Sequence, residues 1–499
     1  MFAQLTQFES PPVDFFSLTP LFILVGGAVV IMLVTSLSPR PIPGWFSTAV
    51  SVAASAGAAV VAMVLWNDVR ESGPYSTVSD AIGIDGFSLF FTVLVSLGVI
   101  ATALVGDAYV RREHIAAPEF HALLLTAATG AIVMASANDL VVMFIGLESL
   151  SIGLYILAAM QFRRPHGREA AMKYFVLGAF SSAFLLYGIA LVYGTTGSTS
   201  LIVIRERTSS LGAMVSPSEL LIVGIALLLV GFAFKVAAAP FHFWAPDVYE
   251  GSGSPVSGFM ASVAKAAAFA GLLRVVVVAL GANEGDWAVP LAVLSAISII
   301  VGAVMAITQN DVKRMLAFSS VGHAGYILVG VQAATAEGMS SALFYLFAYT
   351  FMVIGSFAVV SVIGWDNGHP IERYEGLAKR RPWLAGAFTV FLLAQAGVPM
   401  TAGFVAKFLV IKSAVAEEIY WLAILAMVAS VITAFMYLRI VMAMWARDAD
   451  VDDAPRLAVA PATAFVVAAA VAITLVYGII PDSLIEFTRD AVPALVAGN

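Results

Sequence analysis

The chain contains no cysteine, and this absence excludes several kinds of chemistry. Without cysteine among its 499 residues, the protein can form neither disulfides nor thiolate-held iron–sulfur clusters, and it has no cysteine nucleophile. No glycine-rich phosphate loop and no HExxH metal spacing occurs. A net charge of −7 gives no basic footprint for nucleic acid. We therefore expect this chain to bind no cofactor, no metal and no nucleic acid.

Charged residues are also scarce, and their scarcity defines the fold class. Only 11% of the residues are charged and 61% are hydrophobic, whereas a soluble domain carries roughly 25% charged residues. The apolar residues come in blocks of about 20, the length that crosses roughly 30 Å of hydrocarbon. The short alternating strands of a membrane barrel are missing. The sequence predicts an all-α polytopic protein, with residues 1–499 forming a single membrane domain.

Polar residues divide the apolar sequence into 14 predicted transmembrane helices. These spans cover residues 18–36, 46–66, 87–108, 119–136, 139–160, 170–193, 219–240, 255–280, 287–308, 312–332, 339–363, 384–412, 420–445 and 459–480. The segment before the first span is acidic and lacks the basic region of a cleaved signal, so we expect it to be a short tail.

The distribution of Lys and Arg predicts the orientation. Loops after odd-numbered spans hold 15 of these residues, whereas loops after even-numbered spans and the C-terminal tail hold four. By the positive-inside rule the odd-numbered loops are cytoplasmic, so both termini lie on the outer side of the membrane. The acidic outer loop 68–85 and the acidic stretch 448–453 receive no predicted role.

Six Glu, Lys or Arg residues lie well inside predicted spans, at Glu148, Lys235, Lys265, Arg274, Lys407 and Arg439. Arg274 and Arg439 lie about six residues from a span end, so we expect their side chains to reach the interface along their own stems. Lys235 and Lys407 lie about five residues from their span ends, and depth alone does not decide their role.

Glu148 and Lys265 lie much deeper, about 14 Å from the nearer span end at 1.5 Å per residue. A charge at that depth costs at least a few kcal/mol. We therefore expect both residues to face the protein interior or a hydrated path, each with a partner. A Glu148–Lys235 ion pair that opens and closes could drive the release of a proton.

A short repeat links two of the lysines. The sequence GFAFK ends at Lys235, and GFVAK ends at Lys407. The two copies lie five spans apart, so they cross the membrane in opposite directions, as in transporters built from inverted repeats with broken helices. Helix breakers agree with this interpretation, because Pro240 and Pro246 follow the first copy and Gly397, Pro399 and Gly403 mark the second.

Two histidines lie near the same predicted path. His323 is in the middle of a span, where its near-neutral pKa would suit a proton relay; a core histidine bonded to a carbonyl is the alternative. His242 lies at a cytoplasmic mouth with Asp247 and Glu250, and forms either a proton entry or part of a solvated loop.

These segments resemble a known family. NDLVVMFIGLESLSIGLYIL, FKVAAAPFHFWAPDVYEGSGSPVSGFMASVAK, NDVKRMLAFSSVGHAGY and AGVPMTAGFVAKF are similar to the antiporter-like membrane subunits of NADH–quinone oxidoreductase (respiratory complex I), most of all the N-type subunits. The resemblance implies inverted five-helix repeats in spans 4–8 and 9–13, with broken helices 7 and 12. The corresponding ranges are 18–118 for the first three helices, 119–280 and 287–445 for the repeats, and 459–480 for the last helix.

The resemblance also implies roles for individual residues. Glu148 would tune Lys235, Lys265 would pass protons between two half-channels, and Lys407 would face the outer exit, with His323 as a possible relay. The chain would be a proton-translocating subunit of the enzyme in the bacterial cell (inner) membrane, without redox chemistry of its own. NADH, flavin, iron–sulfur clusters and quinone would be bound by other subunits. Its partners would be the neighbouring antiporter-like subunit, small membrane subunits and the lipid bilayer.

Two alternatives remain open from the sequence. The chain could be a subunit of a multi-subunit cation/proton antiporter, which shares this architecture. It could also be a structural module of the membrane arm that moves no protons.

Overall fold

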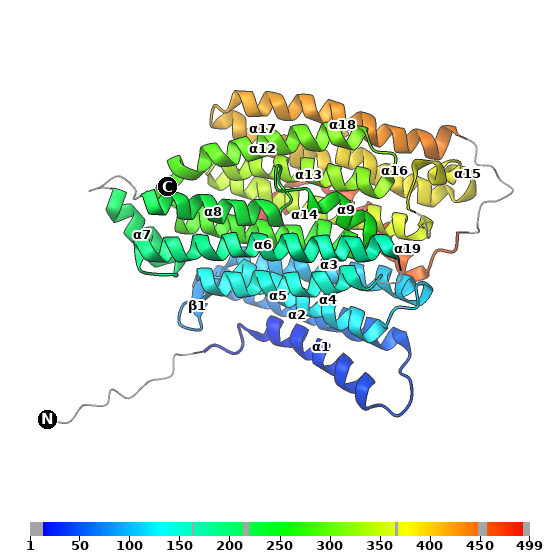
Figure 1. Cartoon of the computed structure of the whole chain (residues 1–499), viewed down its shortest axis with the longest axis horizontal. Coiled ribbons are helices and arrows are strands. Elements are labelled where there is room, and N and C mark those ends of the chain that lie inside the picture. The colour runs from blue at the N-terminus through cyan, green and yellow to red at the C-terminus, as the bar shows by residue number, and fades with distance from the viewer. Residues whose placement is uncertain (1–12, 162–163, 213–218, 365–367, 448–456, 493–499) are drawn as a thin grey trace.

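The computed structural model describes residues 13–161, 164–212, 219–364, 368–447 and 457–492. In these residues the long helices run side by side in one bundle, and their ends define two opposite faces (Figure 1). One face carries β1 and α7, and the other carries α15.

The first half of the chain is helical apart from one hairpin. Its elements are α1 (Thr19–Leu37), α2 (Gly44–Ser72), β1 (Tyr75–Thr77), β2 (Ile82–Ile84), α3 (Gly86–Arg112), α4 (Ala117–Ser136), α5 (Leu140–Ala159), α6 (Pro165–Thr196), α7 (Leu201–Gly212), α8 (Glu219–Lys235) and α9 (Trp244–Gly251). The next span is a single helical rod made of α10 (Ser254–Phe259), a π-helical turn (Met260–Ala264), α11 (Lys265–Leu273) and a second π-helical turn (Arg274–Ala279).

The second half continues with the same architecture. Its elements are a 3₁₀ turn (Gly281–Asn283), α12 (Glu284–Ile307), α13 (Val312–Gln332), α14 (Ala336–Ile363), a 3₁₀ turn (Ile371–Tyr374), α15 (Leu377–Arg380), α16 (Pro382–Ala396), α17 (Ala402–Ala416), α18 (Tyr420–Ala446), α19 (Pro461–Ile479) and α20 (Asp482–Asp490).

Twelve helices in the described part of the chain are long and apolar enough to cross a membrane. Each corresponds to one of the predicted spans, and the two missing from the set are the seventh and the twelfth. The seventh is α8, which has 17 residues, and the twelfth is divided into α16 and α17 of 15 residues each. The protein is therefore a polytopic helical membrane protein, while the total of fourteen spans and their grouping into repeats stay predictions.

The interruption between α16 and α17 has a local cause. Gly397 ends α16 with a φ of +91°, in the left-handed region that glycine tolerates best. Thr401 then begins α17, because its side chain accepts a hydrogen bond from the backbone N–H of Phe404. A Cβ at Gly397 would lie 3.0 Å from Cδ of Lys407. The break therefore also makes room for the lysine stem.

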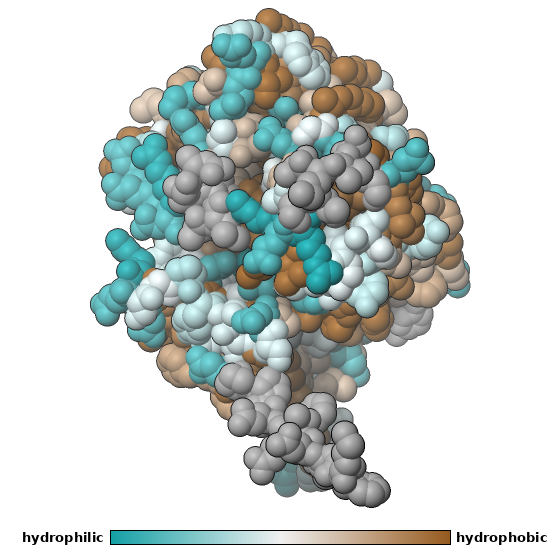
Figure 2. Space-filling model, turned by 90° about the vertical axis from the view of Figure 1, so that its left-hand side faces the viewer, coloured by the Kyte–Doolittle hydropathy of each residue, from teal (hydrophilic) through white to brown (hydrophobic). Residues whose placement is uncertain are grey.

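Burial divides the helices into a centre and a periphery. The rod Ser254–Ala279, α13 and α14 are almost entirely enclosed, while less than half of the apolar stretch is buried in each of α1, α2, α6, α12, α18 and α19. Such exposed apolar faces are expected of helices that contact lipid or neighbouring subunits. At the end that carries β1 and α7, hydrophilic residues gather and brown hydrophobic residues lie between and around them (Figure 2).

Arg274 does not reach the interface, so this part of the sequence prediction is wrong. Its side chain is only 2% exposed and forms an ion pair with Asp85, in which Nη2 lies 2.8 Å from each carboxylate oxygen. It also donates to the carbonyl of Ala135 at 2.5 Å and to Asn138 at 3.0 Å. The acidic loop 68–85 thus gains a structural role, because it ends in the carboxylate that neutralises this arginine.

Arg439 behaves as expected. Its guanidinium donates to the carbonyl of Ile307 at 2.5 Å and to the side chain of Asn310 at 3.1 Å. These acceptors lie at and beyond the last residue of α12, where Arg439 complements the negative helix end. The acidic stretch 448–453 lies outside the described residues.

Candidate proton-transfer site

Glu148 lies on α5 and is half-buried. Its carboxylate accepts a hydrogen bond from the hydroxyl of Ser182 on α6. Ser151 and Tyr155 follow three and seven residues later, so all three α5 side chains share one helix face. The deep carboxylate therefore has a protein partner, as its depth required.

Lys235 is the last residue of α8 and contacts the same face of α5. Its ammonium donates to Ser151 at 2.6 Å and to Tyr155 at 3.3 Å, and it lies 5.4 Å from the Tyr155 ring centroid. Among the described ion pairs, none joins Lys235 to Glu148. Instead, the Lys235 ammonium contacts the face of α5 that also carries Glu148. Ser151, which accepts from this ammonium, lies one helical turn from Glu148.

Lys265 begins α11 at the centre of the bundle and is 2% exposed. Its ammonium donates to the side-chain oxygen of Ser320 at 2.5 Å and to the Ser320 carbonyl at 2.6 Å. It also lies 5.9 Å from the ring centroid of Tyr349. These contacts hold a cation far from lipid, with oxygen partners from α13 and an aromatic face from α14.

Lys407 lies on α17 beside the helix break. It donates to the carbonyl of Ala396, the last residue of α16, and to the hydroxyl of Ser430, both at 2.9 Å. The C-terminal end of a helix carries a partial negative charge, so the break supplies a partner for this cation. The Tyr326 ring centroid lies 4.8 Å from the ammonium.

His323 lies between the two buried lysines. Its Nδ1 is 2.7 Å from the hydroxyl of Tyr345, and its Nε2 is 3.0 Å from the hydroxyl of Tyr437. Both ring nitrogens of His323 therefore contact tyrosine hydroxyls, and not a backbone carbonyl as the alternative expected. The His323 ring also packs against Tyr349 at 4.7 Å between centroids.

Together these contacts form a continuous series across the second half of the bundle. Tyr349 touches both Lys265 and His323; Tyr345 connects His323 to Tyr326, whose ring lies parallel at 6.3 Å between centroids; and Tyr326 packs against Lys407. No hydrogen bond or ring contact within the described residues joins Lys235 to Lys265. The structure thus brings the predicted residues together in two groups, one around Glu148 and Lys235 and one from Lys265 to Lys407.

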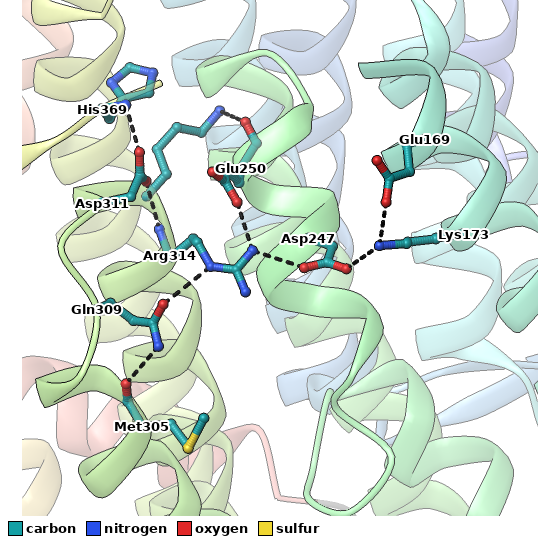
Figure 3. Close-up of polar contacts among 10 residues, drawn as sticks. Glu169, Lys173, Asp247, Glu250, Met305, Gln309, Asp311, Arg314 and His369 are labelled. Carbon is teal, nitrogen blue, oxygen red and sulfur yellow. Dashed lines mark hydrogen bonds and ion pairs between the residues drawn. The ribbon is translucent and has the colours of Figure 1, made fainter. Parts of the chain in front are cut away.

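An ion-pair network connects α6, α9 and α13 at the end of the bundle that carries the basic loops (Figure 3). Asp247 on α9 accepts from Lys173 at 2.5 Å and from Arg314 at 2.9 Å, and Arg314 also pairs with Glu250 at 2.7 Å. Lys173 pairs with Glu169 at 2.7 Å. Burial alone would raise the pKa of Asp247, but the hydrogen bonds from Lys173 and Arg314 outweigh it and lower that pKa.

His242 is not part of a solvated loop. It is 6% exposed and its ring packs against Phe318, with 6.1 Å between ring centroids. Its Nδ1 has no hydrogen-bond partner among the described residues. The histidine is therefore buried, whereas Asp247 and Glu250 take part in the ion-pair network.

A polar cavity of about 50 Å³ lies next to this network. Its walls include the charged or titratable residues Arg112, Glu113, Arg164, Glu250, Lys313 and His369. Burial, together with nearby Lys313 and Arg373, holds the pKa of His369 well below its ordinary value, so this histidine is neutral near pH 7.

Sequence reasoning missed the tyrosines of the buried series and the partners of Arg274. Tyr345 and Tyr349 lie four residues apart on α14, and Tyr437 lies on α18, but a tyrosine in an apolar segment carries no signal of its own. The spacing on α14 could have predicted two rings on one helix face. No cluster of three metal-ligating side chains occurs within the described residues.

The fold and the buried ionisable groups define a polytopic helical membrane protein of the transporter-like class. Residues 137–433 match the family described as the NADH:quinone oxidoreductase/Mrp antiporter transmembrane family. The chain belongs to this family, and two of its curated relatives are N subunits of NADH-quinone oxidoreductase. The subunit from Trichlorobacter lovleyi is 40% identical, with 93% of each chain covered, and the subunit from Salinispora arenicola is 38% identical, with 98% of this chain and 99% of the relative covered.

Solved structures agree with the family assignment. A chain of respiratory complex I from Thermus thermophilus is 36% identical, with a TM-score of 0.79 over 96% of this chain and 100% of that chain. A chain of the Mrp complex from Dietzia has a TM-score of 0.83 over 97% of this chain and 98% of that chain, but only 21% identity. The second similarity shows the fold alone.

Proposed function

We propose that this chain is a proton-translocating subunit of the membrane arm of a bacterial NADH-quinone oxidoreductase. In this proposal quinone reduction in other subunits drives protons through Glu148, Lys235, Lys265 and Lys407, and this chain carries out no redox chemistry. Its partners are the other membrane-arm subunits and the lipid bilayer of the cell membrane. Both termini lie on the outer side, because the basic loops are cytoplasmic. The family and its N-subunit relatives support this assignment.

The observation that carries the proposal is the buried series of contacts from Lys265 to Lys407. Lysines enclosed at this depth are costly, and a series of titratable or hydroxyl-bearing side chains between them offers a path for protons. Such a path needs groups that can both accept and donate a proton, and lysine, histidine and tyrosine all meet this requirement.

His323 can pass a proton without becoming charged for long. A neutral imidazole has one donor nitrogen and one acceptor nitrogen. A proton received at the acceptor nitrogen from one tyrosine hydroxyl is balanced by a proton released from the other nitrogen to the second hydroxyl, while the first tyrosine regains a proton and the second passes its own proton on. The contacts with Tyr345 and Tyr437, at 2.7 and 3.0 Å, offer such partners on both nitrogens.

In the first half of the bundle, Glu148 and Lys235 form the other group. When Lys235 moves towards the carboxylate its charged form is favoured, and when it moves away the proton is more easily released. Ser151 and Tyr155 hold the ammonium one turn along the same face of α5. Exchange of the lysine between these oxygens and Glu148 would couple a small movement to proton transfer.

The test compares two lysine variants in the intact complex reconstituted into liposomes. We expect Lys265→Met to lower the number of protons pumped per electron. Lys412→Met is the matched control, because Lys412 is exposed and its ion pair in the described part of the chain is with Glu337 at the bundle end, at 2.7 Å. An assembled K265M complex with an unchanged ratio would contradict proton transfer and favour a structural module. Purification without redox subunits, together with sodium-dependent exchange, would favour a cation/proton antiporter.

A further inference from the structure

We propose that Arg274 and Arg439 are two equivalent seals, one at each end of the bundle, that stop protons of the buried series from leaking back across the membrane. Arg274 closes the outer end of the first half of the chain, and Arg439 closes the cytoplasmic end of the second half. This inference rests on the proposed function and deepens it, because it names the residues that keep the proton path closed.

The two arginines hold equivalent positions along their helices. Arg274 follows Lys265 by nine residues on the buried rod. Arg439 follows Ser430 by nine residues on α18, and Ser430 accepts a hydrogen bond from Lys407 at 2.9 Å. Nine residues of helix span about 13 Å. Each arginine therefore lies about two and a half helical turns from one end of the buried series.

The hydrogen bonds of the two arginines are also equivalent. Each guanidinium donates to one backbone carbonyl and to one asparagine side chain where a helix ends. These acceptors are Ala135 and Asn138 at the end of α4 for Arg274, and Ile307 and Asn310 at the end of α12 for Arg439. In both places the asparagine follows the accepting carbonyl by three residues.

The backbone around the two asparagines is paired in the same way. The carbonyl of Asn138 accepts from the N–H of Leu201 at 2.8 Å, and the carbonyl of Asn310 accepts from the N–H of Ile371 at 2.9 Å. The residue after each asparagine caps the next helix through its carboxylate, at Asp139 for α5 and at Asp311 for α13. Unrelated helix ends would not share residue order, spacing and pairing, so one arrangement occurs twice in this chain.

The two arrangements lie at opposite ends of the bundle. Asp85, which pairs with Arg274, stands between β2 and α3, at the end that carries β1. The carbonyl of Gln309 accepts from Arg439 at 3.3 Å, and the side chain of Gln309 accepts from Arg314 in the network at the basic end (Figure 3). In the predicted orientation, Arg274 therefore lies at the outer end and Arg439 at the cytoplasmic end.

Arginine has the chemistry that a proton seal requires. A guanidinium stays charged and has no acceptor, so it cannot pass a proton on as lysine, histidine and tyrosine can. A fixed positive charge also repels protons from a narrow path. At an effective dielectric of about 20, a unit charge about 13 Å away lowers the occupancy of a second positive charge about tenfold.

The charge is compensated differently at the two ends. None of the described ion pairs includes Arg439, so its repulsion of protons is not cancelled by a carboxylate. Arg274 is neutralised by Asp85 at 2.8 Å and is 2% exposed, so it closes its end by occupying the polar acceptors there.

The first experiment neutralises the cytoplasmic arginine in the intact complex. Proteoliposomes without NADH receive a pH step, and proton entry is followed with trapped pyranine while valinomycin and K⁺ clamp the membrane potential. We expect Arg439→Gln to raise the protein-dependent proton leak about tenfold. Arg447→Gln is the matched control, because Arg447 lies just after α18, is 62% exposed and pairs with Glu375 at 2.7 Å. An R439Q complex as tight as R447Q would overturn the seal.

The second experiment opens the outer end without leaving a buried charge unpaired. A double variant with Asp85→Asn and Arg274→Gln removes both charges together. We expect a rise in proton leak of the same order as for R439Q. Arg70→Gln is the control at this end, because Arg70 is 65% exposed and lies 3.7 Å from Asp490. A double variant that assembles and is as tight as R70Q would overturn the outer seal.

The outcomes separate the two proposals. If K265M pumps normally, the proposed function fails and the seals fail with it. If K265M loses pumping while R439Q and the double variant stay tight to protons, only the seals are overturned. A leak of R439Q that admits Na⁺ as readily as protons would also overturn them, because it would reveal a loosened bundle. If the double variant does not assemble, R439Q decides.

Discussion

The buried pair between Arg274 and Asp85 allows the sharpest prediction of stability. Replacing Asp85 with alanine would leave a guanidinium that is 2% exposed without its carboxylate. Loss of one partner from a buried ion pair costs about 3–5 kcal/mol. We take about 3 kcal/mol, because Arg274 keeps its bonds to Ala135 and Asn138 and its contact with the Phe87 ring at 5.1 Å.

Asp85 has a second role that must be separated from the first. Its carboxylate caps α3 by accepting the backbone N–H of Ser88 at 2.7 Å, and loss of a cap costs about 1 kcal/mol. We therefore expect D85A to destabilise the chain by about 4 kcal/mol. Asparagine can still cap a helix, so D85N should cost about 3 kcal/mol.

The assay is the retention of this subunit in the detergent-solubilised complex over a temperature series. A double variant with Asp85→Ala and Arg274→Met removes both charges, so it should be more stable than D85A alone. The reasoning fails if D85N behaves like the wild type, or if the double variant loses as much stability as the two single variants combined.

Two further predictions concern the relay and the ion-pair network. His323→Gln should lower the proton-to-electron ratio while the complex still assembles, because an amide cannot exchange tautomers; exposed His114→Gln is the control, and equal ratios would exclude a relay. The lowered pKa of Asp247 means that its bonds to Lys173 and Arg314 stabilise the fold above the ordinary carboxyl value of 3.8 and that this contribution is lost as the pH falls below it. Asp247→Asn should therefore flatten the loss of thermal stability on acidification, and an unchanged profile would contradict this role.

The seventh and twelfth spans show that hydropathy locates a membrane span but not a helix break within it. Lys235 and Lys407 were recognised because a short motif repeats at both, with glycine and proline nearby. Hydropathy still extended each span through the break, because apolar residues continue on both sides. The break itself depends on backbone conformation, such as the positive φ of Gly397, and on where the lysine stem must fit.

Arg274 shows a limit of a different kind. Its distance from a span end favoured a side chain that reaches the interface, and this was wrong because the partner carboxylate lies 189 residues earlier in the chain. Depth along one helix says nothing of which residues approach from other helices. The same limit hid Tyr349, which contacts Lys265 on α11 and His323 on α13.

The sequence by itself determined the membrane class, the positions of the spans to within a few residues and the identity of the ionisable residues inside them. It could do so because crossing a bilayer requires about 20 consecutive apolar residues, and any charge within such a block is conspicuous. Only the tertiary structure decided which groups these residues contact, because hydrogen bonds act over about 3 Å between helices that are far apart in the chain. That is why Lys265 could be singled out from the sequence, while Ser320, Tyr349 and the cavity beside Lys313 could not.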